Sequence, residues 1–496
     1  MKQAATLLFL LALGTVASAQ VDPDAFERQR QQMQQQFNRQ QSQARQQYDD
    51  ARRKAEEEYA AFRKRANEQY AAALQRAWQR TGVEPAEPKP KEPAPPRPPK
   101  PPVDKLPTTN PLPQAQVVPP VVLPPAPLPP IPAPEPTAPT MQVPFYGTMC
   151  DMHTSVEGLR FSMPSVDEKS VAEAWKNLSA QKFDGLLHDC LGQREALHLS
   201  DWGYVQLLGR TGEQLLGKGS NEAVLLQAYL LAQSGYRVRV ARGQNRLILL
   251  MPFNRPIYGY SYTLIDGVRH YVLSHEKGGD IYVSAVEFPR EQVANILMDR
   301  LPDLGSGSHS SRTLQAQRFG TLKATVEVDQ RLIDFLAEYP LSDAWNYYAL
   351  TGLSDGVKAT LYPVMRSQLK GKSHQKAAMM LLDFVQTAFD YATDQEQFGY
   401  ERPLFADESI YYPKNDCEDR SIFYAILVRD LLGLDVVLVH WPGHLATAVH
   451  FPEDVDGDYF TVDGRRYTVC DPTYIGAGVG ETMPQFQNVS AKLVTL

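Results

Sequence analysis

Proline is concentrated in one stretch of this chain. Residues 85–139 hold 24 of its 39 prolines. Because proline fixes φ and has no backbone N–H group to donate, this stretch is not expected to build a hydrogen-bonded core, and it favours extended polyproline II. We interpret residues 85–142 as a disordered, semi-rigid linker. It separates an N-terminal part from residues 143–496, which are long enough for two domains.

The first 19 residues have the pattern of a cleaved secretory signal peptide. Lys2 precedes the apolar residues 4–13, and Ala17-Ser18-Ala19 is a typical cleavage site. No other apolar run approaches the ~18 residues of a membrane span. We therefore expect an exported protein, secreted, periplasmic or at the cell surface, with no transmembrane segment.

Residues 20–84 predict a long helical stalk with a concealed repeat. Aromatic residues recur every eleven positions beside a second series of small or apolar residues: Phe26, Phe37, Tyr48, Tyr59 and Tyr70, and Met33, Ala44, Ala55, Ala66 and Ala77. Eleven residues in three turns is about 3.67 residues per turn, so the stripe runs nearly straight. We expect a homo-oligomer, a coiled coil, through this stripe; a solvated single helix is the alternative. The net charge of −7 and the interleaved charges argue against a nucleic-acid partner.

A cysteine begins a predicted helix near the C-terminus. Apolar residues recur at helical spacing after Cys417, and Gly433 follows the last turn as a stop signal. At a helix N-terminus, unpaired amides and the helix dipole favour a thiolate and can stabilise an oxyanion. The alternative is a small buried hydrophobic side chain, which the polar neighbours Asp416 and Glu418 argue against.

A histidine and an aspartate follow at the ends of predicted strands. Residues 436–439 are typical of a strand buried on both faces, and after a turn His444 begins another strand. Residues 467–471 form a third strand, which places Asp471 at its end. An aspartate in contact with a histidine holds and polarises the imidazole. The sequence thus predicts a thiol active site.

These residues resemble the transglutaminase-like superfamily, a papain-related group. The matching motifs are Asp416-Cys417-Glu418-Asp419, Leu432-Gly433, Gly443-His444 and Asp471-Pro472-Thr473. The resemblance covers about residues 325–490 and implies a catalytic module of a helix and an antiparallel sheet in residues 325–496. It also implies roles for the three residues: Cys417 is the nucleophile, His444 the general base and acid, and Asp471 the residue that orients the imidazole.

The resemblance implies acyl transfer through a cysteine thioester. Water as acceptor gives peptide or amide hydrolysis, and an amine gives crosslinking; the expected substrate is a peptide or protein, including cell-wall peptides. Two departures leave the substrate class open: Asn415 replaces the common glycine, and His444-Leu445-Ala446 replaces His-Ala-Trp. The alternative function is a non-catalytic surface or assembly protein that uses the fold as a binding scaffold.

A degenerate copy of the helix, strand and hairpin pattern is predicted upstream, in residues 143–324. Aligning the copies at their helix-ending glycines and Asp-Gly turns places Gly219 near the nucleophile, Gln244 near the histidine and Ser274 at the aspartate. Because none of these can do the chemistry, we expect a silent module that serves packing or substrate binding. Chance similarity is the alternative. The predicted fold is therefore α+β, with transglutaminase-like modules in tandem.

Other assignments stay open for several of these residues. His440 and His450 are rival candidates for the base beside His444. A zinc site built from the same cysteine, histidine and aspartate fits by ligand type, but no paired ligand spacing supports it, and we expect no metal and no cofactor. In an oxidising compartment, Cys150 and Cys190 are the plausible disulfide pair.

Overall fold

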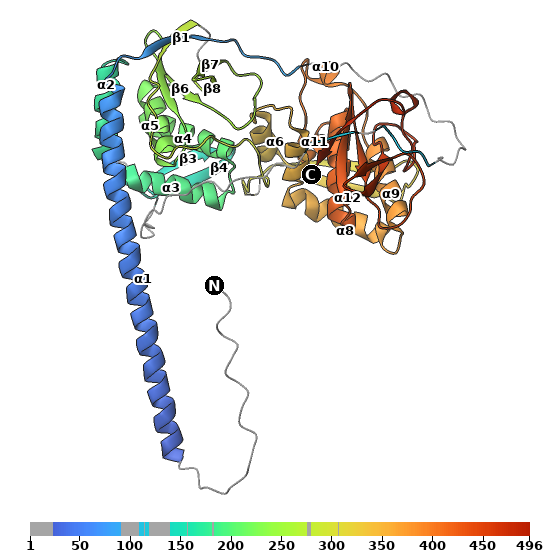
Figure 1. Ribbon diagram of the computed structural model, residues 1–496, viewed down its shortest axis with the longest axis horizontal. Helices are drawn as coiled ribbons and strands as arrows, with labels where there is room; N and C mark the ends of the chain where they lie inside the picture. The colour runs from blue at the N-terminus through green and yellow to red at the C-terminus, as the bar shows by residue number, and fades with distance from the viewer. Residues whose placement is uncertain are drawn as a thin grey trace. The chain divides into compact units, whose positions relative to one another are not determined.

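The computed structural model describes residues 23–90, 109–113, 115–118, 139–155, 157–180, 183–274, 279–305 and 307–496. These residues form a mixed α+β protein whose sheets are almost entirely antiparallel, as predicted (Figure 1). The expected signal peptide and most of the proline-rich stretch lie outside them. The chain divides into two compact units, residues 1–64 and 65–496. Within the described ranges, no helix is long and apolar enough to cross a membrane.

The predicted N-terminal helix is present as α1 (Pro23–Leu74). Up to residue 64 it belongs to the first unit, where side chains pair at helical spacing, such as Arg52 with Glu56 at 2.7 Å. Phe37 and Tyr48 of the eleven-residue series are 59% and 67% exposed there. The homo-oligomer therefore stays a prediction for this part of the stripe.

The last turns of α1 belong to the second unit and join its core. Tyr70 and Leu74 are buried, and the Tyr70 ring packs on Trp175 and Phe288 with centroids 4.5 and 5.5 Å apart. The chain itself therefore covers this end of the stripe. The stalk predicted to reach residue 84 is too long, because residues 79–83 leave the helix and pair as a strand.

The upstream sheet has the strand order β1-β9-β5-β6-β8-β7. Its strands are β1 (Gln79–Val83), β5 (Arg239–Arg242), β6 (Leu247–Met251), β7 (Tyr262–Ile265), β8 (Val268–Val272) and β9 (Gly279–Val283). A hairpin and four helices precede its central strands: β3 (Met141–Phe145), β4 (Thr148–Met152), α2 (Glu168–Ala180), α3 (Phe183–Ala196), α4 (Asp201–Leu216) and α5 (Asn221–Gln233).

A two-stranded ladder and six helices connect this part to the last helix. They are β10 (His309–Gln315), β11 (Lys323–Asp329), α6 (Gln330–Ala337), α7 (Trp345–Thr351), α8 (Asp355–Leu369), α9 (His374–Thr387), α10 (Asp394–Gln397) and α11 (Ala406–Tyr411). Helix α9 packs against α12 (Cys417–Leu432), which in turn covers the second sheet.

The second sheet has the strand order β14-β15-β13-β12-β16-β2. Its elements are β2 (Gln116–Val118), β12 (Val436–Trp441), β13 (His444–Val449), β14 (Tyr459–Val462), β15 (Arg465–Cys470), the 3₁₀ helix η1 (Pro484–Phe486) and β16 (Lys492–Thr495). Leu438 joins the core that contains α12, whereas Val437 and Val439 join a second core on the opposite face. The predicted burial of this strand on both faces is confirmed.

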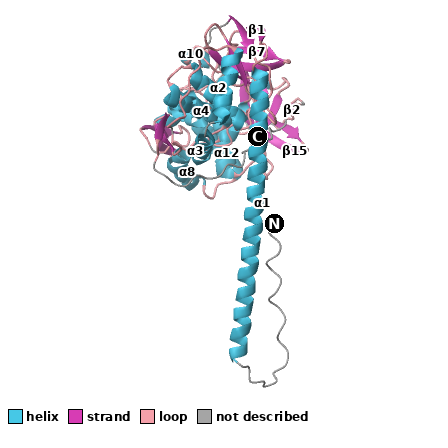
Figure 2. Ribbon diagram, turned by 90° about the vertical axis from the view of Figure 1, so that its left-hand side faces the viewer, coloured by secondary structure: helices cyan, strands magenta, loops and turns pink. Residues whose placement is uncertain are grey.

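The two sheets, whose strands are magenta in Figure 2, share one order of corresponding strands. It is β9-β5-β6-β8-β7 upstream and β16-β12-β13-β15-β14 downstream, each with a helix directly before the first of its central strands. Both hairpins turn at an Asp-Gly pair with positive φ: 50° and 77° at Asp266 and Gly267, and 50° and 74° at Asp463 and Gly464. Both turns therefore have the backbone that matches strand twist in tight hairpins.

The proline-rich stretch is not a free spacer throughout. Strand β2 pairs in parallel with β16, and just before it Leu112 N–H donates to Tyr459 O at 2.9 Å. Near the start of the stretch, Glu87 pairs with Arg269 at 3.0 Å. The expectation of a disordered linker is wrong for these segments, because their non-proline residues supply N–H groups and side chains that pair with both sheets.

Candidate active site

Helix α12 begins with a capping box that fixes the position of Cys417. The Asp416 carboxylate accepts the N–H of Asp419 at 3.5 Å, and the Asp419 carboxylate accepts the N–H of Asp416 at 3.3 Å. Leu404 N–H donates to the same Asp419 side chain at 2.9 Å. Acidic side chains at these positions satisfy orphan amides and complement the helix dipole. Cys417 is thus the first residue of the helix, as predicted.

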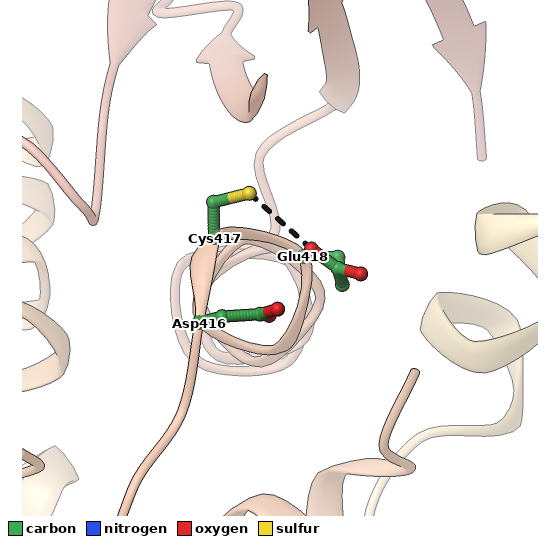
Figure 3. A group of neighbouring side chains, drawn as sticks. All are labelled: Asp416, Cys417 and Glu418. Carbon is green, nitrogen blue, oxygen red and sulfur yellow. Dashed lines mark hydrogen bonds between the residues drawn. The ribbon is translucent and has the colours of Figure 1, made fainter. Parts of the chain in front are cut away.

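The thiol of Cys417 is buried and points to a carboxylate of its own helix. Sγ–H donates to Glu418 Oε2 at 3.2 Å (Figure 3), and the backbone N–H of Leu445 donates to Sγ. Only 6% of the cysteine is exposed. Burial, with the charges of Glu418 and Asp416, raises the pKa of Cys417 well above its usual value. The expectation that the helix N-terminus favours a thiolate is wrong here, because burial and two carboxylates outweigh the amides.

His444 and Asp471 form a buried pair, as the sequence predicted. His444 Nε2 lies 2.8 Å from Asp471 Oδ2, with side chains 0% and 1% exposed. The other oxygen, Asp471 Oδ1, accepts the N–H groups of Thr473 at 2.9 Å and Tyr474 at 3.2 Å. Because both carboxylate oxygens are held, the imidazole has a fixed orientation.

The second nitrogen of His444 is left available. Nδ1 is buried and makes no hydrogen bond with any residue that the structure describes. The ring stacks on Phe486 at 5.1 Å and 4°, and lies parallel to Trp441 at 6.1 Å. Leu445, which follows His444 directly, contacts Cys417 Sγ through its amide. His444 and the residue that bonds the thiol are thus consecutive in β13, and the S–H group of Cys417 is directed to Glu418.

The rival histidines have other environments. The His440 ring packs on Trp345 with centroids 4.5 Å apart, and His450 Nδ1 lies 2.9 Å from Arg466 O. Side chains with the spacing of cation ligands do gather at the start of α12. Among the described residues, none of these groups includes His444 or Asp471, and they are drawn from Asp394, Glu401, Asp416, Cys417, Glu418 and Asp419. The geometry therefore gives no support to a zinc site built from Cys417, His444 and Asp471.

Two buried residues that the sequence analysis missed hold the loop of Asp471. Gln386 Nε2 donates to Asp471 O at 3.0 Å and to Tyr474 O at 2.9 Å, and Gln386 Oε1 accepts Gly476 N–H at 3.2 Å. Arg420 Nη1 donates to Gln386 O at 3.1 Å. The available signal was a glutamine one helical turn after Leu382, on the apolar face of α9.

The strand registers correct the upstream residue expected to correspond to His444 and keep the one expected to correspond to Asp471. When the hairpins are aligned at their Asp-Gly turns, β6 and β8 match β13 and β15 with Arg246 at the position of His444. Gln244 lies two residues earlier, in the turn. Ser274 keeps the position of the aspartate, and its Oγ is buried without a hydrogen bond to the described part of the chain.

The upstream residue that corresponds to Cys417 also differs from the expected one. Asn221 begins α5 as Cys417 begins α12, each directly after its capping residue. Asn221 Oδ1 accepts the N–H of Leu247 at 2.9 Å, just as Cys417 Sγ accepts that of Leu445. Asn221, and not Gly219, therefore corresponds to Cys417. Aligning the two helices at their terminal glycines gave Gly219, because α12 has two more residues than α5 between its start and that glycine.

The remaining cysteines are free thiols. Cys150, Cys190 and Cys470 are all buried, and burial raises the pKa of Cys150 to about 11 and that of the other two to about 12. The disulfide considered for Cys150 and Cys190 is not formed in this structure. No family model, no curated protein and no solved structure matches this chain.

Proposed function

We propose that this protein is a cysteine-dependent acyl-transfer enzyme that acts on peptide or protein amides. The observation that carries the proposal is the buried pair of His444 and Asp471, in which Nε2 is bound and Nδ1 is free. An unsatisfied buried nitrogen costs stability, and a structural histidine has no need of it. The hydrogen bond from the Leu445 amide ties Sγ of Cys417, the proposed nucleophile, to the residue that follows His444.

The chemistry follows from these positions. His444 Nδ1 takes the proton of the Cys417 thiol, and the thiolate attacks the amide carbonyl carbon. Backbone amides at the start of α12 stabilise the oxyanion. The imidazolium then protonates the departing amine and leaves a thioester, which water hydrolyses or a primary amine captures. Asp471 keeps the imidazole oriented and stabilises its positive charge.

The resting site needs one rearrangement before this reaction. The thiol donates to Glu418, and burial with two nearby carboxylates holds its pKa high. The proposed reaction requires a rotation about the Cα–Cβ bond of Cys417 that turns Sγ away from Glu418 and toward the free nitrogen of His444. Substrate binding that engages the Glu418 carboxylate favours this rotation, because it removes the acceptor that holds the thiol.

The transglutaminase-like fold and its tandem repetition belong to the same proposal. The order of a helix with an N-terminal cysteine, followed by strands bearing histidine and aspartate, supports the fold. The shared strand order of the two sheets supports the duplication. With Asn221, Arg246 and Ser274 at the three positions, the upstream module is inferred to be silent. Export rests on the pattern of residues 1–19 alone.

A non-catalytic scaffold is the second candidate. It is favoured by the burial of Cys417 and by the raised pKa of its thiol. In that case the buried pair would serve only the packing of β13 and β15. The two candidates differ in whether His444 controls the reactivity of Cys417.

Alkylation with iodoacetamide at neutral pH, followed by peptide mass spectrometry, separates the two candidates. An enzyme should show Cys417 labelled faster than Cys470, with a rate that falls at least about tenfold in His444→Ala, since the imidazole is the base. Labelling of Cys470 is the internal control. Equal rates for Cys417 in both proteins would favour the scaffold. Trapping a thioester from a library of peptides and cell-wall fragments, with Cys417→Ser as the control, then identifies the substrate.

A further inference from the structure

Lys89 lies beside the carboxylate that holds the thiol. Its side chain is 5% exposed, although lysine is seldom buried, and its Nζ is 4.0 Å from Glu418 Oε1. Nζ also lies 6.0 Å from the centroid of the Trp345 ring, within reach of a cation–π interaction. The other oxygen, Glu418 Oε2, accepts the hydrogen bond of the Cys417 thiol. One carboxylate therefore binds both the lysine and the nucleophile.

The surroundings of Glu418 carry an excess of acidic groups. Asp394, Asp416 and Asp419 are buried near it, and burial with their mutual repulsion raises the pKa of Asp394 to about 9 and that of Asp419 to about 8. The cations that act on this group are Lys89 and Arg420. These raised pKa values show that negative charge is unfavourable here, and a positive charge in the place of Lys89 offsets the cost of ionising Glu418 and its neighbours.

The segment that delivers Lys89 is fastened to the upstream module. Glu84 and Tyr262 exchange backbone hydrogen bonds at 2.7 and 3.1 Å, and the Tyr262 hydroxyl donates to Glu87 at 2.8 Å. Arg269 pairs with the same Glu87 carboxylate. Residues 84–90 therefore form a strap that is anchored on one module and ends in the active site of the other.

We propose that Glu418 and Trp345 form a subsite for a primary ammonium group, and that Lys89 fills this subsite in the resting protein. The inference deepens the proposed function, since it takes the neighbouring Cys417 as the nucleophile. An alkylammonium side chain of a substrate displaces Lys89 and takes its contacts. The strap therefore competes with the substrate for this subsite. It is released when the ammonium group of the substrate binds Glu418.

Binding of n-butylammonium, measured by titration calorimetry, tests the subsite without any turnover. Lys89→Ala should bind this cation at least about tenfold more tightly than the wild-type protein, a factor equivalent to ~1.4 kcal/mol. The double variant Lys89→Ala/Glu418→Gln should lose the gain, and neutral n-butanol should show none. Lys372→Ala, which removes an exposed lysine, is the matched control. Equal affinities in Lys89→Ala and wild type overturn the proposal.

A second measurement links the subsite to the thiol. Lys89→Ala should change the alkylation rate of Cys417 by at least about threefold, and saturating n-butylammonium should restore the wild-type rate. If Lys89→Ala does not fold, Lys89→Met retains the apolar stem and replaces it in both experiments. Calorimetry repeated in the Cys417→Ser background tests the ammonium subsite separately from the proposed enzymatic function. Binding there without catalysis in the parent protein would sink the proposed function and leave the subsite intact.

Discussion

Gln386 Nε2 donates a hydrogen bond to the backbone carbonyl of Asp471 at 3.0 Å. This contact joins helix α9 to the end of strand β15, and so connects two segments that are far apart in the sequence. Since Asp471 in turn orients His444, the glutamine acts on the imidazole through the loop that carries the aspartate. Gln386 is therefore a positioning residue in the proposed mechanism.

Gln386→Leu should destabilise the protein. The substitution leaves buried carbonyls of the Asp471 loop without their donor, at a cost of about 1–3 kcal/mol in the free energy of unfolding. Urea denaturation measures the change. Gln375→Leu, at an exposed position of the same helix, should stay within about 0.5 kcal/mol of wild type. A similar effect of the two substitutions would contradict this role for Gln386.

Asp471→Asn should lower turnover while the protein stays folded. The amide retains the size of the side chain but no longer stabilises an imidazolium, so we expect kcat to fall by about a hundredfold or more. Steady-state kinetics on a substrate found by trapping gives the value. Asp463→Asn lies at an exposed turn of the same hairpin, where asparagine tolerates the positive φ, and is the control. Undiminished kcat in Asp471→Asn would remove the aspartate from the mechanism.

The stability of the protein should fall as the pH rises from about 4 to about 9. Burial raises the pKa of Asp394 to about 9, of Asp419 to about 8 and of Glu408 to about 7. Carboxyl groups with a raised pKa bind protons more tightly when folded, so their contribution is complete below the pKa of the unfolded chain. It is lost as the pH passes through the folded value.

Asp394→Asn isolates one of these groups. The amide cannot ionise, so the variant should lose less stability than wild type between pH 6 and pH 9, by up to ~1.4 kcal/mol for each pH unit that Asp394 titrates. Thermal and urea unfolding across this range provide the measurement. Asp355→Asn, at an exposed helix start, should follow the wild-type curve. Parallel curves for Asp394→Asn and wild type would rule out a raised pKa at this position.

Removal of residues 20–64 should convert the mature protein to a monomer without loss of the globular fold. The exposed Phe37 and Tyr48 lie in this part of the stripe, whereas Tyr70 and Leu74 already belong to the core. Each exposed aromatic buried between chains contributes a few kcal/mol at most, about 1.5–3 kcal/mol, so several are needed to offset the entropy of association. Light scattering on both forms gives the oligomeric state.

Two controls sharpen this experiment. Phe37→Gln with Tyr48→Gln should weaken association while the helix is retained. Deletion through residue 84 should instead unfold the upstream module, because it removes Tyr70 and strand β1. A wild-type protein that is monomeric at micromolar concentration would show that the stripe has no partner in a second copy.

Local signals in the sequence were sufficient for the elements that bear the candidate site. Helical periodicity with Asp416 before it and Gly433 after it predicts the bounds of α12, because capping and left-handed termination act within a few residues. The strand ends at His444 and Asp471 follow from short apolar runs and turns. Local periodicity also made the long helix α1 predictable, although its end at Leu74 was not.

Tertiary structure alone decided what surrounds these residues. The correspondence of Arg246 with His444 and of Asn221 with Cys417 depends on pairing between strands and on tertiary contacts, which no local signal specifies. The burial of Lys89 and the support from Gln386 bring together residues distant in the chain. The pKa of Cys417 is governed by desolvation and by nearby carboxylates, so it depends on the packing of the whole module. The sequence by itself therefore determined which groups are present, and only the fold determined their protonation and their partners.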